Sequence, residues 1–372
     1  MKIMSVFGTR PEAIKMAPVV KALEADSRFK SSVCVTGQHA EMLDQVNTIF
    51  GVTPDIDLKI MKAGQGLTHI TTAVLEGMEA VLAQVRPDYV LVHGDTTTST
   101  AAAIAAFYAG IKVGHVEAGL RTHNLLSPWP EEANRQLTGR LASLHFAPTA
   151  LSRQNLLTEN VEASAIHVTG NTVVDALLMV KARLDRGNAM SLEVREQFRF
   201  LDPSKRLILV TGHRRENHDG GIERVCEALA AISHRKDVQI VYPVHLNPKV
   251  KRAASKVLKY VDNVFLIDPL SYLPFVWMLG ASYIVITDSG GLQEEAPSLG
   301  KPVLVTRDTT ERPEAIDAGT VKLVGTDTAK LIASVTELLD DDKLYTQMSM
   351  AHNPYGDGKA AERIVNILAE NI

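Results

Sequence analysis

The sequence predicts an α/β protein with two doubly wound parallel sheets, each in a domain of its own. Short apolar runs alternate with helix-compatible segments along almost the whole chain, a pattern typical of parallel strands covered by helices on both faces. Several of these runs end at a glycine-containing turn, as strands do where they lead into a helix. At 372 residues the chain is too long for one ordinary core, because a domain usually holds about 100–200 residues.

Twelve apolar runs are predicted to be strands, and they fall into two sets. The first set is Lys2–Phe7, Ser32–Thr36, Tyr89–Val92, Lys112–Val116, His145–Ala147 and Ile166–Thr169. The second set is Leu207–Thr211, Gln239–Tyr242, Val264–Ile267, Tyr283–Thr287, Pro302–Val305 and Val321–Val324. So many strands exceed one small sheet, and two sheets are the economical prediction.

Helix-compatible segments separate nearly all of the predicted strands. The clearest are Pro11–Asp26, Thr97–Tyr108, Glu131–Leu144, Ile222–Ser233 and Thr326–Leu339. The predicted domains are residues 1–170 and 171–358, because a helix-like stretch and then a polar, glycine-containing segment follow Gly170. A final helix, residues 359–372, follows a turn-rich segment and is expected to join the first domain.

Composition and charge exclude several classes of protein. A formal charge of −4 argues against general binding to nucleic acid or to membrane surfaces. No apolar run approaches the ~20 residues that span a bilayer, and Met1–Phe7 is too short for a signal peptide. Cys34 and Cys226 lie in apolar runs and are predicted to be buried free thiols, which fits a reducing compartment. The sequence therefore predicts a soluble, cytoplasmic protein.

The segment Tyr283–Arg312 contains a candidate nucleotide-binding turn. An apolar strand ends at an Asp-Ser-Gly-Gly turn (288–291), and a helix is predicted over Leu292–Leu299. Unpaired N–H groups at a helix start suit a phosphate, and two glycines let a ligand approach the backbone closely. Glu295, one helical turn later, could bind ribose hydroxyls. The glycines by themselves are equally consistent with a capped turn that binds no ligand.

Polar residues follow several other predicted strands, where open α/β sheets bind their ligands. Arg10 and Lys15 follow the first strand and suit an anionic ligand, although they could also be solvated charges on an amphipathic helix. Asp95 follows the third strand and could simply cap the next helix. Glu117 leaves the fourth strand, where no helix cap is needed; a site role is favoured because carboxylates are seldom buried unpaired.

Other polar residues are less decisive. Glu131 and Glu132 lie in the first turn of a predicted helix, where acidic residues commonly compensate the helix dipole. Glu131 could also form an i,i+4 ion pair with Arg135. His213 has polar company at a strand end, which favours a site role, whereas His245 is as readily a core histidine. Neither histidine has metal-ligand spacing and no cysteine pair supports a zinc site, so no metal is predicted.

Three common nucleotide and hydrolase fingerprints are absent from the sequence: GxGxxG with its distant acidic residue, the P-loop, and GxSxG. Redox chemistry with a dinucleotide, P-loop hydrolysis and α/β-hydrolase chemistry therefore lose their usual signatures. Two Rossmann-like halves remain. The second half is expected to bind a nucleotide diphosphate, and the first offers Arg10, Lys15, Asp95, Glu117 and Glu131.

Long motifs run from the first residues to the second half of the chain. They include FGTRPEAIKMAP (7–18), VHGDTTT (92–98), GHVEAGLRT (114–122), PWPEEANR (128–135), VTGNT (168–172), GHRREN (212–217), YPVHLNP (242–248), TDSGGLQEEAPSLGKPVLV (287–305) and RDTTERPEA (307–315). Together they resemble the bacterial non-hydrolysing UDP-N-acetylglucosamine 2-epimerases. The resemblance implies a GT-B-like fold with two Rossmann-like domains facing a central cleft, a homodimer, and no NAD or metal. It also implies reversible conversion of UDP-GlcNAc to UDP-ManNAc, which supplies ManNAc-type sugars for surface polysaccharide.

The same resemblance assigns roles to particular residues. The catalytic residues would be Asp95, Glu117, Glu131 and His213, so that Glu131 gains a role that its position alone does not suggest. The UDP-sugar would be bound by Arg10, Lys15, Arg135, His213, Phe275, Ser289, Gly290, Gly291, Glu295 and Arg312. Gln38 and Gln65 match positions through which some family members bind an activating UDP-GlcNAc. Two positions depart from relatives that carry Gln: Glu41 in that regulatory region and Leu270 near the nucleotide.

The expected mechanism is elimination of UDP to a 2-acetamidoglucal and re-addition of UDP, with the proton returned to the opposite face. Loss of UDP makes carbon 1 oxocarbenium-like, which acidifies the hydrogen on carbon 2. A hydrolysing 2-epimerase and a GT-B glycosyltransferase are the nearest alternatives. A non-catalytic sensor of sugar nucleotides is an alternative from a different class.

Overall fold

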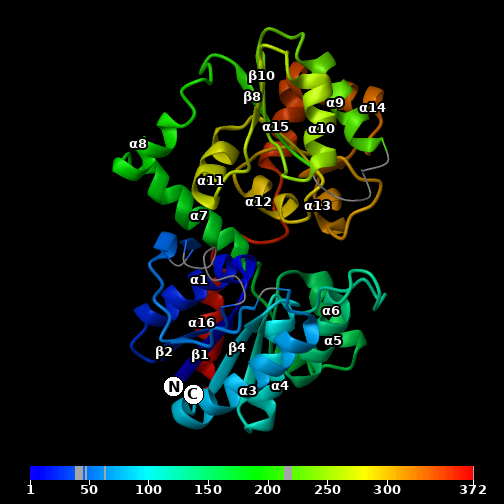
Figure 1. The fold of residues 1–372 in the computed structure, drawn as a ribbon. Coiled ribbons are helices and arrows are strands. Elements are labelled where there is room, and N and C mark those ends of the chain that lie inside the picture. The colour runs from blue at the N-terminus through cyan, green and yellow to red at the C-terminus, as the bar shows by residue number, and fades with distance from the viewer. Residues whose placement is uncertain (38–44, 47, 63, 213–219, 372) are drawn as a thin grey trace. The chain divides into compact units, whose positions relative to one another are not determined.

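The computed structural model describes residues 1–37, 45–46, 48–62, 64–212 and 220–371, which form two α/β units (Figure 1). Unit 1 consists of Met1–Met179 and Tyr355–Ile372, and unit 2 consists of Val180–Pro354. The chain therefore leaves unit 1 within the helix α7 (Thr172–Asp185) and returns to it at Tyr355. The division predicted after Gly170 lies just before this helix.

Unit 1 is built on a seven-stranded parallel sheet with the order β3-β2-β1-β4-β5-β6-β7. Its strands are β1 (Lys2–Phe7), β2 (Lys30–Val35), β3 (Ile56–Asp57), β4 (Tyr89–His93), β5 (Lys112–Val116), β6 (Leu144–Ala147) and β7 (Ile166–Val168). The central strands β1, β4 and β5 are buried along nearly their whole length, as strands covered on both faces are. All six predicted strands of this half are confirmed. Strand β3 was not predicted, because two residues make no apolar run.

Helices cover this sheet, and the longest of them carry the packed core. They are α1 (Arg10–Ala25), α3 (Leu67–Val85), α4 (Thr97–Tyr108), α5 (Glu131–Leu141), α6 (Ala150–Thr158), the 3-10 turn η1 (Ala163–Ala165), the start of α7, and α16 (Ala360–Glu370). Helix α4 is rich in alanine, serine and threonine and is buried along most of its length, where it packs against β4 and lies between the neighbouring helices α3 and α5. Small side chains let the helix lie close to the strands, which brings the residues before α4 near the sheet.

Unit 2 repeats this architecture with a six-stranded parallel sheet, ordered β10-β9-β8-β11-β12-β13. Its strands are β8 (Arg206–Thr211), β9 (Val238–Pro243), β10 (Val264–Ile267), β11 (Ile284–Thr287), β12 (Val303–Val305) and β13 (Val321–Leu323). Its helices are α8 (Ala189–Glu196), α9 (Gly221–Ile232), α10 (Pro248–Leu258), α11 (Tyr272–Ala281), α12 (Leu292–Ser298), α13 (Pro313–Asp317), α14 (Thr328–Asp340) and α15 (Asp342–Met350). The predicted α/β class with two doubly wound parallel sheets is confirmed.

Both sheets have the same topological switch point, where the chain order reverses beside the first strand of the unit. In unit 1 this point lies between β1 and β4, and in unit 2 it lies between β8 and β11. Doubly wound sheets bind their ligands outside the carboxyl ends of the strands at such points. The residues that follow β1, β4, β5, β8 and β11 therefore lie where a ligand is expected to bind. No helix of the described residues is long and apolar enough to cross a membrane.

Candidate functional site

Two carboxylates leave neighbouring strands at the carboxyl edge of the unit 1 sheet. Asp95 follows β4 and Glu117 follows β5, and these strands pair in parallel. Glu117 has a φ of 61°, a left-handed conformation that costs a residue with a Cβ atom about 1–2 kcal/mol. The turn then passes Gly119, where a Cβ atom would lie 2.2 Å from the carbonyl oxygen of Ser152. The backbone turns sharply here, which directs the Glu117 side chain beyond the end of its strand.

Glu117 is only 9% exposed, and among the described residues three side chains lie around its carboxylate. Lys15 of α1 donates from Nζ to Oε2 at 2.5 Å, and Asn171 donates from Nδ2 to the same oxygen at 2.7 Å. The Nε2 atom of His93, the last residue of β4, lies 3.8 Å from that oxygen. A cation and an amide donor both favour the ionised form of a carboxylate. Glu117 is therefore held as an anion in a protected position.

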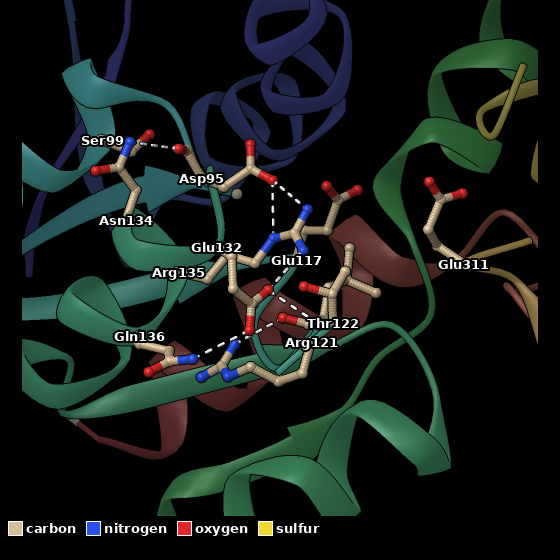
Figure 2. Close-up of polar contacts among 12 residues, drawn as sticks. Asp95, Ser99, Glu117, Arg121, Thr122, Glu132, Asn134, Arg135, Gln136 and Glu311 are labelled. Atoms are coloured by element: carbon tan, nitrogen blue, oxygen red, sulfur yellow. Dashed lines mark hydrogen bonds and ion pairs between the residues drawn. The ribbon is translucent and has the colours of Figure 1, made fainter. Parts of the chain in front are cut away.

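Asp95 is paired with an arginine, as Figure 2 shows. Arg135 of α5 donates from Nε and Nη2 to Oδ2 of Asp95, at 2.9 and 2.7 Å. The alternative that Asp95 caps the next helix is wrong, because Thr96 is the N-cap of α4 and its Oγ1 accepts from the N–H of Ser99 at 3.0 Å. With the capping position taken by Thr96, the Asp95 carboxylate is available for the ion pair.

Arg135 also contacts Glu132, a residue whose position in the sequence suggests only ordinary dipole compensation. Its Nη1 donates to Oε2 of Glu132 at 3.0 Å, so the guanidinium lies between two carboxylates (Figure 2). The predicted Glu131–Arg135 pair is wrong, because Arg135 turns toward Asp95 and Glu132 instead. Glu131 is the first residue of α5 and is half-buried. Within the described part of the chain, its side chain forms no hydrogen bond or ion pair.

Glu132 is completely buried and anchors the loop that precedes α5. It accepts hydrogen bonds from the backbone N–H groups of Thr122 and His123, at 3.0 and 3.1 Å, and from Nε2 of Gln136 at 3.1 Å. Burial alone would raise the pKa of Glu132, but these three donors and the Arg135 guanidinium bring its pKa below the ordinary value. No local sequence pattern distinguishes Glu132 from Glu131, because the loop donors come from residues about ten positions earlier in the chain.

Another buried carboxylate, that of Glu12, connects the turns that follow β1 and β4. Its Oε2 accepts from the N–H groups of Gly8 and Thr9 at 3.0 and 2.7 Å. Its Oε1 accepts from the hydroxyl groups of Thr96 and Ser99 at 2.6 and 2.8 Å. The Thr9-x-x-Glu12 spacing is the capping-box signature, and it could have identified this residue as structural. Arg10, the first residue of α1, directly follows this braced turn and is half-buried.

Three buried histidines lie beneath the same edge of the sheet. Burial lowers the pKa of His93 to about 4, of His115 to about 3 and of His145 to about 4. His115 contacts the carbonyl oxygen of Gly94 through Nε2 at 2.7 Å; since a carbonyl can only accept, Nε2 carries the proton. All three rings are therefore neutral at pH 7, and His115 braces the residue immediately before Asp95.

The depressed pKa of His115 predicts a loss of stability in acid. Between about pH 6.5 and pH 3 the unfolded chain binds a proton that the folded chain does not, so this contribution is complete above pH 6.5 and is lost as the pH falls toward 3. For His115 alone, the step from pH 7.5 to 5.5 is expected to cost about 1 kcal/mol. Urea unfolding at both pH values should show a smaller acid loss in His115→Gln than in the wild type. Equal losses of unfolding free energy in the two proteins would contradict the lowered pKa of His115.

In unit 2, the candidate nucleotide-binding turn joins β11 to α12 beside the switch point. The hydroxyl groups of Thr211 and Thr287, at the ends of β8 and β11, are 2.7 Å apart, and Oγ1 of Thr287 accepts from the N–H of Ser289 at 2.9 Å. In the described residues, the N–H groups of Gly290 and Gly291 form no hydrogen bond. The helix ends one residue earlier than predicted, at Ser298. The turn thus presents two unused backbone donors at the carboxyl edge of the sheet.

Buried side chains of α12 hold the loop that carries Arg312. The hydroxyl of Thr310 donates to Oε1 of Gln293 at 2.6 Å, and Nε of Arg312 donates to Oε1 of Glu294. Gln293 is itself completely buried and donates to the carbonyl oxygen of Ser289 at 3.2 Å. Arg312 is therefore positioned by the same helix that begins at the Ser289–Gly291 turn. The sequence alone did not reveal the roles of Gln293 and Glu294.

The remaining predicted site residues are distributed as follows. Glu295 and Phe275 are half-buried on α12 and α11, and Leu270 is a half-buried residue before α11. Gln65 accepts from the N–H of Lys62 at 3.1 Å in a local turn. His213, Gln38 and Glu41 lie outside the described residues.

Comparison with known proteins identifies the family. The profile of the family described as UDP-N-acetylglucosamine 2-epimerase matches residues 21–369. The UDP-N-acetylglucosamine 2-epimerase of Escherichia coli K12 is 60% identical over 372 residues, which are all of this chain and 99% of that protein. The enzyme of Campylobacter jejuni is 52% identical over 372 residues, which are 99% of this chain and 97% of that protein.

Solved structures agree with this result. The UDP-GlcNAc 2-epimerase of Neisseria meningitidis, bound to UDP-GlcNAc, is 51% identical, with a TM-score of 0.91 and full coverage of both chains. A glycosyltransferase from Rickettsia africae is 14% identical, with a TM-score of 0.63 and coverage of 99% of this chain and 98% of that one, and it shares the fold alone. The predicted GT-B-like class is confirmed. The chain belongs to the UDP-N-acetylglucosamine 2-epimerase family, and it is an enzyme, an isomerase.

Proposed function

We propose that this enzyme interconverts UDP-GlcNAc and UDP-ManNAc by epimerisation at carbon 2. The two carboxylates at the ends of adjacent central strands carry this proposal: Glu117 held by Lys15, and Asp95 held by Arg135. Binding a neutral sugar needs few charges, whereas moving a proton on and off carbon needs positioned acids and bases. The full-length identity to epimerases of several bacteria gives independent support.

The chemistry proceeds in two steps that balance. In the first, a carboxylate removes the proton from carbon 2 while the bond from carbon 1 to the oxygen of UDP breaks, which forms a 2-acetamidoglucal. In the second, a proton is delivered to the opposite face of carbon 2, and the oxygen of UDP adds again to carbon 1. Since each face of the sugar needs its own proton donor or acceptor, more than one of Asp95, Glu117 and Glu131 takes part, with His213 assisting.

UDP is proposed to bind at the switch point of unit 2, at the Ser289, Gly290 and Gly291 turn. The unused N–H groups of the two glycines and the guanidinium of Arg312 support this placement, because fixed donors and cations stabilise a diphosphate leaving group. Further contacts of the UDP-sugar are assigned, by family resemblance, to Arg10, Lys15, Arg135, His213, Phe275 and Glu295.

Arg312→Ala is expected to weaken UDP binding by about 10- to 100-fold, since hydrogen bonds to charged groups contribute about 1.5–3 kcal/mol. Isothermal titration with UDP measures the change, and circular dichroism checks that the variant is folded. Arg199→Ala is the matched control, because Arg199 is highly exposed and, among the described residues, forms an ion pair with its local neighbour Glu196 on unit 2. Wild-type affinity in the Arg312 variant would remove Arg312 from the nucleotide site.

The decisive test is proton NMR of UDP-GlcNAc incubated with the enzyme in deuterated water. Epimerisation through deprotonation produces UDP-ManNAc signals and removes the carbon-2 proton signal from both sugars. Accumulation of free sugar and UDP would instead indicate the hydrolysing reaction. An unchanged spectrum with tight UDP binding would indicate a transferase or a sensor.

We further propose a cytoplasmic homodimer that supplies ManNAc-type sugars for surface polysaccharide. The family resemblance supports the dimer and the pathway, and the two free, buried thiols of Cys34 and Cys226 fit a reducing compartment. Activation by a second UDP-GlcNAc near Gln38 and Gln65 also rests on that resemblance. Light scattering tests the dimer, and a sigmoidal rate dependence on UDP-GlcNAc would test the activation.

A further inference from the structure

Asn171 connects the carboxylate of Glu117 to two distant parts of unit 1. It lies between β7 and α7 and is 2% exposed. Its backbone N–H donates to the carbonyl oxygen of Tyr355 at 2.7 Å, where the chain re-enters unit 1. Its Oδ1 accepts from the N–H of Val173 at 3.1 Å, as an N-cap residue of α7 does. Its Nδ2 donates to Oε2 of Glu117 at 2.7 Å.

These contacts determine which way the amide of Asn171 faces. Because the backbone N–H of Val173 can only donate, the atom it contacts is the amide oxygen. The amide nitrogen is therefore directed at Glu117 and offers it an N–H. The hydrogen bond from Val173 to the amide oxygen of Asn171 thus fixes the orientation in which the amide nitrogen donates to the carboxylate of Glu117.

The backbone around Asn171 leaves the residue little freedom to move. A Cβ atom on Gly170 would lie 3.3 Å from the Cα atom of Gly356, so the outgoing and returning segments touch at glycines. About one turn later, Asp175 of α7 accepts hydrogen bonds from the N–H groups of Ala360 and Ala361 at the start of α16, at 3.2 and 2.8 Å. Asn171 is thus held by elements on either side of it.

Lys15 and Asn171 differ in how well they fix the carboxylate of Glu117. Lys15 reaches Oε2 with a flexible four-carbon stem and is 20% exposed in its side chain, so it supplies charge more than direction. Asn171 has a short side chain, is buried, and is anchored at its backbone and at its amide oxygen. A catalytic group performs best when its rotamer is locked by such a supporting hydrogen bond.

We infer that Asn171 is the positioning residue for Glu117, holding its carboxylate ionised and in one orientation toward carbon 2 of the UDP-sugar. This inference rests on the proposed function, because it assumes that Glu117 acts on the sugar. Neither the sequence motifs nor the family resemblance assigned a role to Asn171. Its role follows from the placement of its amide between α7 and the end of β5.

The variant Asn171→Asp separates the positioning of Glu117 from the capping of α7. Asp caps helices as well as Asn does, so the variant keeps the acceptor for Val173 and loses the donor for Glu117. The value of kcat for UDP-GlcNAc epimerisation is expected to fall about 10- to 100-fold, as for other residues that orient a catalytic group. The KM value for UDP-GlcNAc and the affinity for UDP should change less than about threefold, because Asn171 is inferred to act through Glu117 and not by binding the ligand itself.

The pH profile gives a readout that a capping role would not move. In Asn171→Asp two carboxylates lie in contact and retain a proton to higher pH, so the acidic limb of kcat against pH moves upward. Lys15 of α1 and His93 of β4 also face Glu117, and the variant leaves both in place. Asn171→Ala removes the donor without adding charge, and it should lower kcat without this upward shift.

Asn188→Asp is the matched control. Asn188 caps α8 by accepting from the N–H of Ser191 at 3.1 Å, is exposed, and should retain wild-type kcat. An active wild type with normal kcat in both Asn171 variants would overturn the inference alone. A wild type that neither epimerises UDP-GlcNAc nor exchanges its carbon-2 proton would overturn the proposed function, and the inference with it.

Discussion

Glu117→Gln is expected to lower the turnover of UDP-GlcNAc by about 10³-fold, within the range that general acid–base groups contribute. The substitution preserves the shape of the side chain but removes the carboxylate that is proposed to exchange a proton with carbon 2. It also removes the negative charge that Lys15 contacts at 2.5 Å. Initial rates of UDP-ManNAc formation and of deuterium incorporation at carbon 2 measure the loss.

The chain offers a closely matched control for this variant. Glu24 forms an equally short contact with Lys21 on the exposed surface of α1, so Glu24→Gln breaks another lysine pair away from the sheet edge. That control should retain normal turnover, since surface pairs contribute little. Both variants should bind UDP with wild-type affinity, which shows that they are folded. Near-normal turnover of Glu117→Gln would exclude Glu117 as the catalytic acid or base and would contradict the proposed mechanism.

Glu132→Ala is expected to reduce the free energy of unfolding by about 3–5 kcal/mol, the usual cost of removing one partner from a buried ion pair. The completely buried carboxylate of Glu132 accepts hydrogen bonds from Arg135 and from the N–H groups of Thr122 and His123. In Glu132→Ala each of these donors would lose this acceptor. Activity should fall as well, because Arg135 also holds Asp95. Urea unfolding followed by circular dichroism measures the stability of the variant.

The pH dependence of this difference supplies a second check. The pKa of Glu132 lies below its ordinary value of 4.5, so its contribution to stability is complete above that pH and is lost as the pH falls through the folded value. The free energies of unfolding of the wild type and of Glu132→Ala should therefore show their full difference at pH 7 and become equal in strong acid. Glu162→Ala, at an exposed position with no side-chain cap, should match the wild type. A decrease of less than about 1 kcal/mol in the free energy of unfolding of Glu132→Ala would show that the loop N–H groups find other acceptors.

Local sequence was sufficient for the strands and for most helix positions. Runs such as Lys2–Phe7 and Lys112–Val116 are apolar because strands of a parallel sheet are buried on both faces, so their limits could be read directly. The glycine turn after β11 and the Thr9-x-x-Glu12 signature are likewise local patterns. Strand β3 was missed because it pairs over only two residues, and its position depends on β2 rather than on its own sequence.

The rule that ligands lie beyond strand ends predicts Asp95, Glu117, Arg10 and Lys15 as candidate site residues from sequence alone. It cannot choose between the two adjacent glutamates at the start of α5. Glu132 faces inward to the loop and to Arg135, whereas Glu131 is half-buried and free of such partners among the described residues. One position along a helix rotates the side chain by about 100°, and only the packing around α5 decides which of the two is structural.

By itself, then, the sequence determined the α/β class, the strands and the side chains that follow them, because burial and turn formation depend on neighbouring residues. The tertiary structure decided how those side chains pair. Lys15 meets Glu117 across 102 positions of sequence, Arg135 meets Asp95 across 40, and Asn171 meets Glu117 across 54. Hydrogen bonds and ion pairs form only over distances of about 3 Å, and such distances between remote residues exist only once the strands are ordered in the sheet.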